Sequence, residues 1–388
     1  REEYGLTTIQ LTGITWDHTR GYLPMVATAQ RFGEANPEVA IEWRKRSLKA
    51  FGDQPLEELA PHFDLLVIDH PFVGVAAARG LLLPLDEHLP SEFIADQEAN
   101  SVGLSHPSYV YGGHLWALAI DAAAPVSAWR ADLLARAGEE PPETWEQLLG
   151  LARRGLVALP AVKIDSLMHV YMLCIALGEE PFGTPERVVS PQVGAAALEH
   201  LRELLALCDP ACLERNPIRT YEALAETDGP AYCPFAYGYS NYARPGYARH
   251  QLTFGGLVRY NGQRLRSTLG GTGLAISAGC RNPEAALAYA RYVASPECQR
   301  TLYVTSGGQP GHRAAWLDEA ANELCAGYFR ATLQTLDEAF LRPRYDGYDA
   351  FQDQAAELVH AYLREGGNPY TVVERIDTAY RASLQAAQ

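Results

Sequence analysis

The order of strand-like and helix-like segments in the first 70 residues constrains the fold most. Residues 7 to 14 alternate in polarity and are β-branched, as in a strand, and residues 39 to 44 also read as a strand. Residues 25 to 32, between them, have helical character. Residues 63 to 68 form a continuous apolar run of strand length, typical of a strand buried on both faces of a parallel sheet. We therefore predict a doubly wound α/β fold.

Polar or glycine-rich residues follow each predicted strand. The first strand leads into TrpAspHisThrArg (16 to 20), and Asp69 and His70 come directly after the buried run. Asp121 ends a third apolar stretch, and a late segment reads LeuGlyGlyThr (269 to 272). In open α/β sheets, ligands bind outside the carboxyl ends of the strands. The sequence therefore predicts a ligand cleft.

Length and composition limit what this cleft belongs to. A chain of 388 residues exceeds what one hydrophobic core usually supports, so we expect two lobes. The apolar runs are far shorter than the roughly 20 residues that a membrane span needs. A net charge of -15 disfavours a nucleic-acid binder, which would present clustered Lys and Arg, and we interpret it as serving solubility.

The seven cysteines are scattered, odd in number and contain no CxxC pair, so no metal framework and no cofactor are indicated. Cys208 and Cys212, in CysAspProAlaCys, could form a local disulfide or remain reduced thiols. The chain begins ArgGluGluTyrGlyLeu, without a charged region followed by an apolar one. Either a secretory signal has been removed or the protein is cytosolic.

Further elements can be predicted downstream. A GlyGly turn within residues 111 to 121 predicts a hairpin that leads out of the first lobe. Thr144 and Gln147 have the spacing of a capping box, and residues 192 to 207 have helical periodicity. Residues 267 to 277 return to a strand, and a helix over 282 to 293 follows.

Five segments together resemble a known family, the family 1 extracellular solute-binding proteins of ABC importers, which are similar to maltose-binding protein. These segments are residues 112 to 126, 270 to 277, 282 to 293, 295 to 300 and 308 to 313. The resemblance implies a type II periplasmic-binding fold, with a small polar ligand between two α/β lobes. It also implies a membrane permease as partner, a monomer, and a periplasmic or extracellular location, with a cytoplasmic one as the alternative.

Mapped onto this chain, the resemblance places residues 1 to 122 and 276 to 325 in the N-terminal lobe. The C-terminal lobe would hold residues 123 to 275 and 326 to 388. Hinge strands would lie near residues 120 to 126 and 274 to 277. Closure about such hinges couples ligand binding to recognition by a partner.

In the first lobe, Trp16 could stack on a sugar ring, Asp17 and His18 could bond its hydroxyl groups, and Arg20 could grip a carboxylate. The alternative is that Trp16 packs in the lobe core and Arg20 pairs with a surface acidic residue. Asp69, which could instead cap the next helix, is a further candidate.

Two other first-lobe positions and several in the second lobe complete the predicted site. Asp121 falls at the hinge, where a hinge hydrogen bond is its alternative role. Asp165 is expected as a helix cap, with the following helix directing two of its side chains to the cleft. Glycine-rich residues after 269 could offer backbone amides. The remaining candidates are His70, His169, Tyr171, Tyr237, Tyr239, Asn241, Gly271, Thr272 and Arg344.

The ionic first-lobe residues favour a monosaccharide, polyol, sugar acid or similar carboxylate over a long oligosaccharide. Two alternatives stay open. An enzyme on the same fold could use Asp17, His18, Asp69 and His70 in acid-base chemistry, although the hinge lacks the cysteine of thiamin-degrading relatives. A ferric-ion carrier could use Tyr237, Tyr239 and His18, although a glycine separates its two tyrosines.

Overall fold

The computed structural model describes residues 8–386, which divide into two units. Unit 1 contains the described part of Arg1–Ala122 together with Gly270–Glu323, and unit 2 contains Ala123–Leu269 with the described part of Leu324–Gln388. Unit 1 resumes at Gly270 instead of the predicted 276, because strand β12 (Thr272–Ile276) pairs with strands of unit 1. The second predicted hinge, near 274 to 277, therefore falls inside a sheet.

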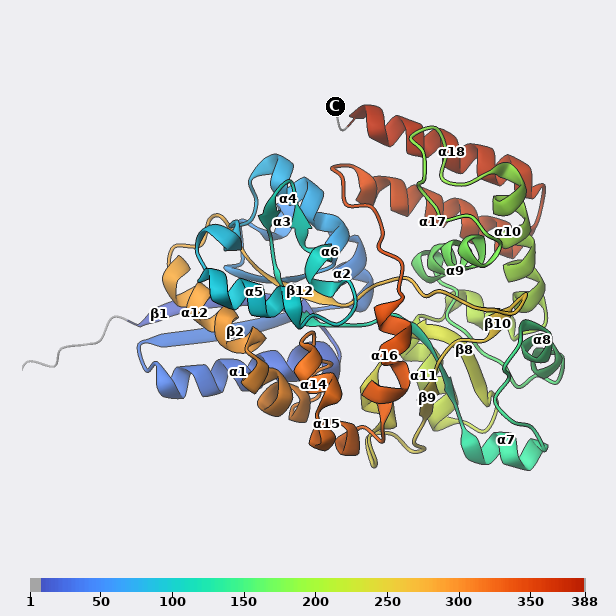
Figure 1. Cartoon of the computed structure of the whole chain (residues 1–388), viewed down its shortest axis with the longest axis horizontal. Helices are drawn as coiled ribbons and strands as arrows, with labels where there is room; N and C mark the ends of the chain where they lie inside the picture. The colour runs from blue at the N-terminus through green and yellow to red at the C-terminus, as the bar shows by residue number, and fades with distance from the viewer. Residues whose placement is uncertain (1–7, 387–388) are drawn as a thin grey trace, which may run out of the picture. The chain divides into compact units, whose positions relative to one another are not determined.

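The five-stranded sheet of unit 1 has the order β2-β1-β3-β12-β6. Strand β1 (Ile9–Trp16) runs parallel to β2 (Val39–Arg46) and β3 (Leu65–Ile68). Strand β12 runs antiparallel to β3 and to β6 (Leu118–Asp121). Helix α1 and helix α4 lie on opposite sides of this sheet (Figure 1), so the predicted strands are confirmed and the winding is α/β. Residue 7, the predicted start of β1, lies outside the described residues.

The other elements of unit 1 are short strands and helices. Its remaining strands are β4 (Val110–Tyr111) and β5 (His114–Leu115). Its α-helices are α1 (Thr19–Ala35), α2 (Leu48–Asp53), α3 (Leu56–Leu59), α4 (Val73–Arg79), α5 (Ser91–Ala99), α6 (Ser105–Ser108), α12 (Pro283–Ala294), α13 (Pro296–Cys298), α14 (Arg313–Leu317) and α15 (Glu319–Leu324). Its 3-10 helices are η1 (His70–Phe72) and η2 (Leu85–Glu87), and η5 (Gln299–Tyr303) is a π-helix.

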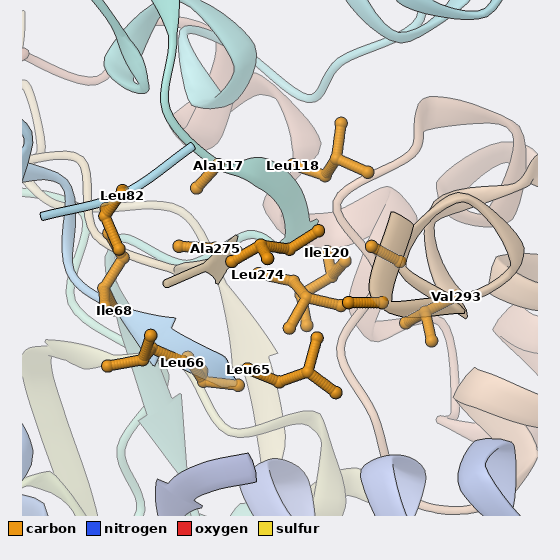
Figure 2. Close-up of a cluster of buried hydrophobic side chains, with 14 of the residues drawn as sticks. Leu65, Leu66, Ile68, Leu82, Ala117, Leu118, Ile120, Leu274, Ala275 and Val293 are labelled. Carbon is orange, nitrogen blue, oxygen red and sulfur yellow. The ribbon is translucent and has the colours of Figure 1, made fainter. Parts of the chain in front are cut away.

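The core of unit 1 centres on β3, whose four residues are all buried. Figure 2 shows Leu65 and Leu66 of β3 near Leu274 of β12, with Val293 of α12 beside them. Burial of this apolar surface is the main favourable term in folding. It also fixes the register of β3 and β12, in which Gly273 pairs with Ile68.

Unit 2 has a smaller antiparallel sheet of order β8-β7-β9, so its pairing is not that of a parallel doubly wound sheet. Its strands are β7 (Pro125–Trp129), β8 (Tyr232–Tyr237), β9 (Thr253–Gly255), β10 (Arg259–Tyr260) and β11 (Gln263–Arg264). Its helices are α7 (Ala131–Ala137), α8 (Trp145–Arg153), α9 (Lys163–Ala176), α10 (Pro191–Ala206), α11 (Pro217–Glu226), α16 (Tyr328–Asp337), α17 (Tyr348–Glu365) and α18 (Pro369–Ala386), with 3-10 helices η3 (Pro210–Glu214) and η4 (Ser240–Ala243). Helix α17 packs against both α9 and α18 (Figure 1).

Local sequence signals were accurate where they rested on turn and cap chemistry. Gly112 and Gly113 have positive φ and turn the β4-β5 hairpin, and Thr144 with Gln147 forms the predicted capping box. Strand β7 ends at Trp129, and helix α7 begins two residues later. Across residues 8–386, no helix combines the length and apolarity of a membrane crossing.

The close packing around β12 leads to a stability prediction. A Cβ atom on Gly273 would lie 2.6 Å from the Tyr109 ring and 2.8 Å from the Ala117 Cβ. Gly273→Ala is expected to lower the free energy of unfolding by about 1–3 kcal/mol, because the core has no room for the methyl group. Gly279→Ala is the control, since the nearest atom there is 3.6 Å away. Chemical denaturation of both variants tests this, and equal stabilities would contradict it.

Candidate functional site

Four strand termini of unit 1 meet at one edge of its sheet. Strands β1, β3 and β6 end there with Trp16, Ile68 and Asp121. Antiparallel β12 begins there, with Thr272 paired to Asp121. We call this the strand-end edge. The sequence segments that were predicted to gather there, with Asp69 directly after β3, are therefore neighbours within unit 1.

A buried ion pair between Arg20 and Asp121 joins helix α1 to strand β6. Arg20 Nε donates to Asp121 Oδ2 at 2.8 Å, and Arg20 Nη2 donates to Oδ1 at 2.5 Å. The Thr272 backbone amide also donates to the Asp121 carboxylate. Both side chains are almost inaccessible to water. Burial raises the pKa of Asp121, and the Arg20 charge opposes that shift. Arg20 thus pairs with an acidic residue, as its alternative role had it, but the partner is a buried carboxylate and not the surface acid that the sequence suggested.

Trp16 packs in the core instead of presenting a ring face for stacking. Its exposed fraction is 2%, and its ring lies 5.3 Å from that of Phe51. A Cβ atom on Gly21 would lie only 2.3 Å from the Trp16 ring, so Gly21 is packed flat against it. The prediction of a stacking face at Trp16 is therefore wrong for this structure. Trp16 Nε1 is nevertheless buried without a hydrogen-bond partner among the described residues.

Asp17 and His18 serve the start of helix α1. Asp17 is exposed and pairs with Lys45 at 2.8 Å. His18 is the N-cap residue, and its Nδ1 accepts from the Arg20 amide at 3.0 Å. Burial and the nearby Arg20 charge lower the pKa of His18 to about 3, against the opposing charge of Asp17. His18 is therefore neutral at pH 7 and stabilises a helix end, a role that the sequence did not predict for it.

Asp69 caps the short helix η1, because its Oδ1 accepts from the His70 amide at 2.9 Å. A helix cap was the alternative role predicted for Asp69. His70 is fully buried, and its ring lies edge-on to that of Tyr109 at 6.4 Å. Asp69 Oδ1 also lies 3.2 Å from His70 Nδ1, so Asp17, His18 and Asp69 each have a contact within unit 1.

Gly271 and Thr272 lie at the entry to β12. Gly271 has φ of +89°, a conformation that strongly favours glycine. Thr272 is 3% exposed, and its Oγ1 has no hydrogen-bond partner among the described residues. A register shift follows between Thr272 and Gly273. The strand-end edge therefore holds two buried polar atoms without partners, at Trp16 and at Thr272.

In unit 2, Tyr237 ends strand β8 opposite Pro125 of β7. The Tyr237 hydroxyl lies 3.2 Å from Thr268 Oγ1, and Tyr221 donates to the Tyr237 carbonyl oxygen at 3.0 Å. The following Gly238 is required, because a Cβ atom there would overlap the Tyr328 hydroxyl. Tyr237 is half-buried and remains the candidate in unit 2.

The other aromatic and amide candidates of unit 2 are buried. Tyr239 is 2% exposed, with its ring 6.1 Å from that of Tyr221, and Asn241 is fully buried in η4. Packing within unit 2 thus accounts for the aromatic segment better than a surface for stacking does. Arg344 is half-buried and belongs to the segment before α17.

Helix α9 contributes core residues. His169 Nε2 lies 2.8 Å from the Pro160 carbonyl oxygen, and burial lowers its pKa to about 4. The Tyr171 hydroxyl contacts that of Tyr348 at 3.5 Å. Asp165 is not the predicted cap, because α9 begins at Lys163 after N-cap Val162. Burial raises the pKa of Asp165 to about 8.

Sequence reasoning used residues 308 to 313 for the family resemblance but named none of them as a site residue. Gln309 hydrogen-bonds to Ala122 through its backbone and its side chain: the Ala122 amide donates to the Gln309 carbonyl oxygen at 3.2 Å, and Gln309 Nε2 donates to the Ala122 carbonyl oxygen at 2.8 Å. Gly311 passes so close to β6 that a Cβ atom would lie 2.0 Å from the Ala119 carbonyl oxygen. The GlnProGly sequence was the available signal for such a close approach.

The described residues contain no group of three or more His, Cys, Asp or Glu side chains that could hold a metal ion. Two ligands of the ferric-ion alternative also have other contacts, since Tyr237 bonds Thr268 and His18 caps α1.

The Arg20–Asp121 pair leads to a double-mutant prediction. Arg20→Met is expected to lower the free energy of unfolding by about 3–5 kcal/mol, because it leaves a buried carboxylate unpaired. Adding Asp121→Leu is expected to restore most of that loss. Guanidinium unfolding of both variants measures the effect. A double variant no more stable than the single one would contradict it.

The His18 cap leads to a pH prediction. The folded pKa of about 3 is lower than the ordinary value of 6.5, so the unfolded chain binds more protons between these values. The contribution of His18 to stability is thus complete above pH 6.5 and is lost as the pH falls toward 3. His18→Asn, which keeps a capping side chain but does not titrate, is expected to flatten the fall in unfolding free energy between pH 6.5 and 4. Parallel pH profiles for both proteins would refute this role.

Two solved solute-binding proteins are similar to nearly the whole chain. One, from Thermotoga lettingae TMO and bound with α-D-tagatose, covers 97% of this chain and 100% of its own, with 19% identity and a TM-score of 0.83. The other, maltose-bound MalE3 of T. maritima, covers 97% and 100%, with 17% identity and a TM-score of 0.81. At these identities the likeness shows the predicted two-lobe α/β fold.

Sequence relatives identify the family. The mannitol-binding protein of Pseudomonas aeruginosa PAO1 is 32% identical over 130 residues, which span 32% of this chain and only 28% of that protein. The profile of the family described as "Bacterial extracellular solute-binding protein" matches residues 27–323, more than half of the chain. The resemblance and the expectation of a binding protein instead of an enzyme are confirmed: the chain belongs to the bacterial extracellular solute-binding proteins.

Proposed function

We propose that this protein binds a small neutral polyhydroxylated molecule, a monosaccharide or polyol, and delivers it to the permease of an ABC importer. Family membership supports the binding role. Two of the similar proteins bind ligands of this chemistry, since they are a mannitol-binding protein and a protein bound with α-D-tagatose, whereas MalE3 is bound with the disaccharide maltose. Family membership also supports a periplasmic or extracellular location and action as a monomer.

The observation that carries the proposal is the pair of unpartnered polar atoms at the strand-end edge, Trp16 Nε1 and Thr272 Oγ1. Buried polar groups in native proteins nearly always have a hydrogen-bond partner, and a bound ligand is one that could supply it. Sugar and polyol hydroxyls both donate and accept. They can therefore satisfy both an indole N–H and a threonine hydroxyl.

The same edge argues for a neutral ligand. A sugar acid was predicted because Arg20 and His18 were expected to face it. Arg20 is neutralised by Asp121, and burial keeps His18 uncharged at pH 7. Lys45 is paired with Asp17. The observations that favoured a carboxylate ligand are thus explained by internal contacts, which leaves neutral hydroxyl recognition as the better-supported chemistry.

Ligand capture by closure of the two units is part of the proposal. The chain passes between them at 122/123, 269/270 and 323/324, and each passage is a place where torsions can change. In this scheme the strand-end edge supplies the contacts of unit 1, and Tyr237 supplies an aromatic contact from unit 2.

A ligand panel tests the proposal. The full chain is titrated by calorimetry with mannitol, ribitol and tagatose, and in parallel with maltose, maltotriose and glucarate. We expect at least one small neutral ligand to bind with micromolar or tighter affinity, and we expect it to raise Tm because it binds only the folded state. Binding confined to maltotriose or to glucarate would overturn the proposed ligand class.

Thr272→Val separates ligand binding from folding. The variant is expected to weaken binding of the best ligand about 5- to 15-fold, through loss of one hydrogen bond of about 1–1.5 kcal/mol. Its free energy of unfolding without ligand should not fall, because the removed hydroxyl has no partner to lose. Thr301→Val, at an exposed position on η5, is the control for both measurements. A variant that is less stable but binds normally would show a structural role instead.

A further inference from the structure

Cys208 and Cys212 lie against each other in unit 2. Cys208 follows helix α10, and Cys212 lies in the 3-10 helix η3. The intervening turn is ordered by Asp209, whose carbonyl oxygen accepts from the Cys212 amide at 2.9 Å and whose Oδ1 accepts from the Ala211 amide at 2.9 Å. This turn brings the two cysteines onto neighbouring turns of the chain, where their thiols interact. Both residues are thiols in this structure.

The surroundings make the two sulfur atoms unequal. Arg215 Nη1 lies 3.9 Å from Cys212 Sγ, and the Leu159 amide donates to that sulfur. The hydrogen bond from Cys208, followed by these contacts, lowers the pKa of Cys212 to about 7 in spite of its burial. The Cys208 thiol, which also contacts the Leu204 carbonyl oxygen at 3.3 Å, has its pKa raised by donating to Cys212. A low-pKa thiol beside a second cysteine is the usual setting of a reactive pair.

The two cysteines also differ in their exposure to solvent. Cys212 is fully buried, whereas Cys208 is half-buried. The only other half-buried cysteine is Cys280, which belongs to unit 1. A reagent from solution therefore reaches this pair through Cys208.

We propose that Cys208 and Cys212 are a redox site that forms a reversible disulfide when the protein meets a disulfide oxidant. The Cys208 sulfur first passes its proton to the neighbouring Cys212 thiolate and attacks the oxidant, forming a mixed disulfide and releasing one thiolate, which then takes up that proton. The Cys212 thiolate then attacks Cys208 Sγ and releases the second thiolate. Two cysteines are oxidised by two electrons, and one external disulfide is reduced to two thiols.

Helix η3 is hydrogen-bonded to other segments of unit 2, so a disulfide at this position would constrain those segments as well. The Cys212 and Arg215 carbonyl oxygens both accept from the Ala161 amide, at 3.0 and 3.1 Å, just before α9. The Leu213 carbonyl oxygen lies 2.9 Å from His360 Nε2 of α17. A disulfide between Cys208 and Cys212 would thus constrain the turn between α10 and η3, which is hydrogen-bonded to the start of α9 and to α17. Oxidising compartments outside the cytoplasm supply such disulfide oxidants.

Thiol counting tests the proposal on the full chain. The reduced protein is equilibrated with glutathione buffers of rising disulfide content, then denatured and alkylated with N-ethylmaleimide. We expect the adduct count to fall from seven to five, that is, seven cysteines minus two. Tryptic peptide 203–215 contains both cysteines; on oxidation it should lose its two N-ethylmaleimide adducts and be lighter than the unmodified reduced peptide by the mass of two hydrogen atoms. Seven adducts at every glutathione ratio would overturn the proposal.

Variants identify the partners. Cys208→Ser and Cys212→Ser should each keep six adducts at all ratios, whereas Cys280→Ser should fall from six to four. Cys233 is the rival partner, because its fully buried thiol interacts electrostatically with Cys212. Cys233→Ser should still yield the lighter peptide 203–215. A disulfide that disappears in that variant would instead assign the bond to Cys233. Circular dichroism of each variant confirms that it is folded before its thiols are counted.

Discussion

The buried pair of Arg20 and Asp121 is the interaction on which the strand-end edge of unit 1 depends. It connects the first turn of α1 to the last residue of β6, with 100 residues of chain between them, and the Thr272 amide completes the carboxylate's hydrogen bonds. Such a pair is not strong evidence of net stability, since desolvation offsets much of its attraction. Both side chains must nevertheless be present and in contact, because either partner alone would be an unpaired buried charge. The pair therefore sets which side chains can occupy the edge.

The fold was predictable because its signals are local. Four consecutive buried residues made β3 recognisable, and Thr144 with Gln147 announced helix α8 through hydrogen bonds that span only three residues. The unit boundary near 270 was not predictable in this way. Strand β12 joins unit 1 through pairing with β3 and β6, which are distant in sequence.

The candidate site was predicted less well, because a side chain's role depends on its long-range partner. Arg20 looked like a ligand residue until Asp121 was found against it, and Tyr239 looked like a stacking surface until its ring was found buried near Tyr221. Cap residues were ambiguous for another reason. His18 and Asp69 follow strands and precede helices, and a polar side chain at that point suits both a ligand and a helix start.

The hydrogen bonds around Gln309 restrict how the first passage between the units can bend. Ala122 is held on both its amide and its carbonyl oxygen by Gln309 of unit 1. Two residues later, the Ala124 carbonyl oxygen accepts from the Gly238 amide of unit 2 at 3.2 Å. Ala123 lies between these two hydrogen-bonded residues. The proposed closure of the units would therefore act at this passage through the backbone torsions of Ala123.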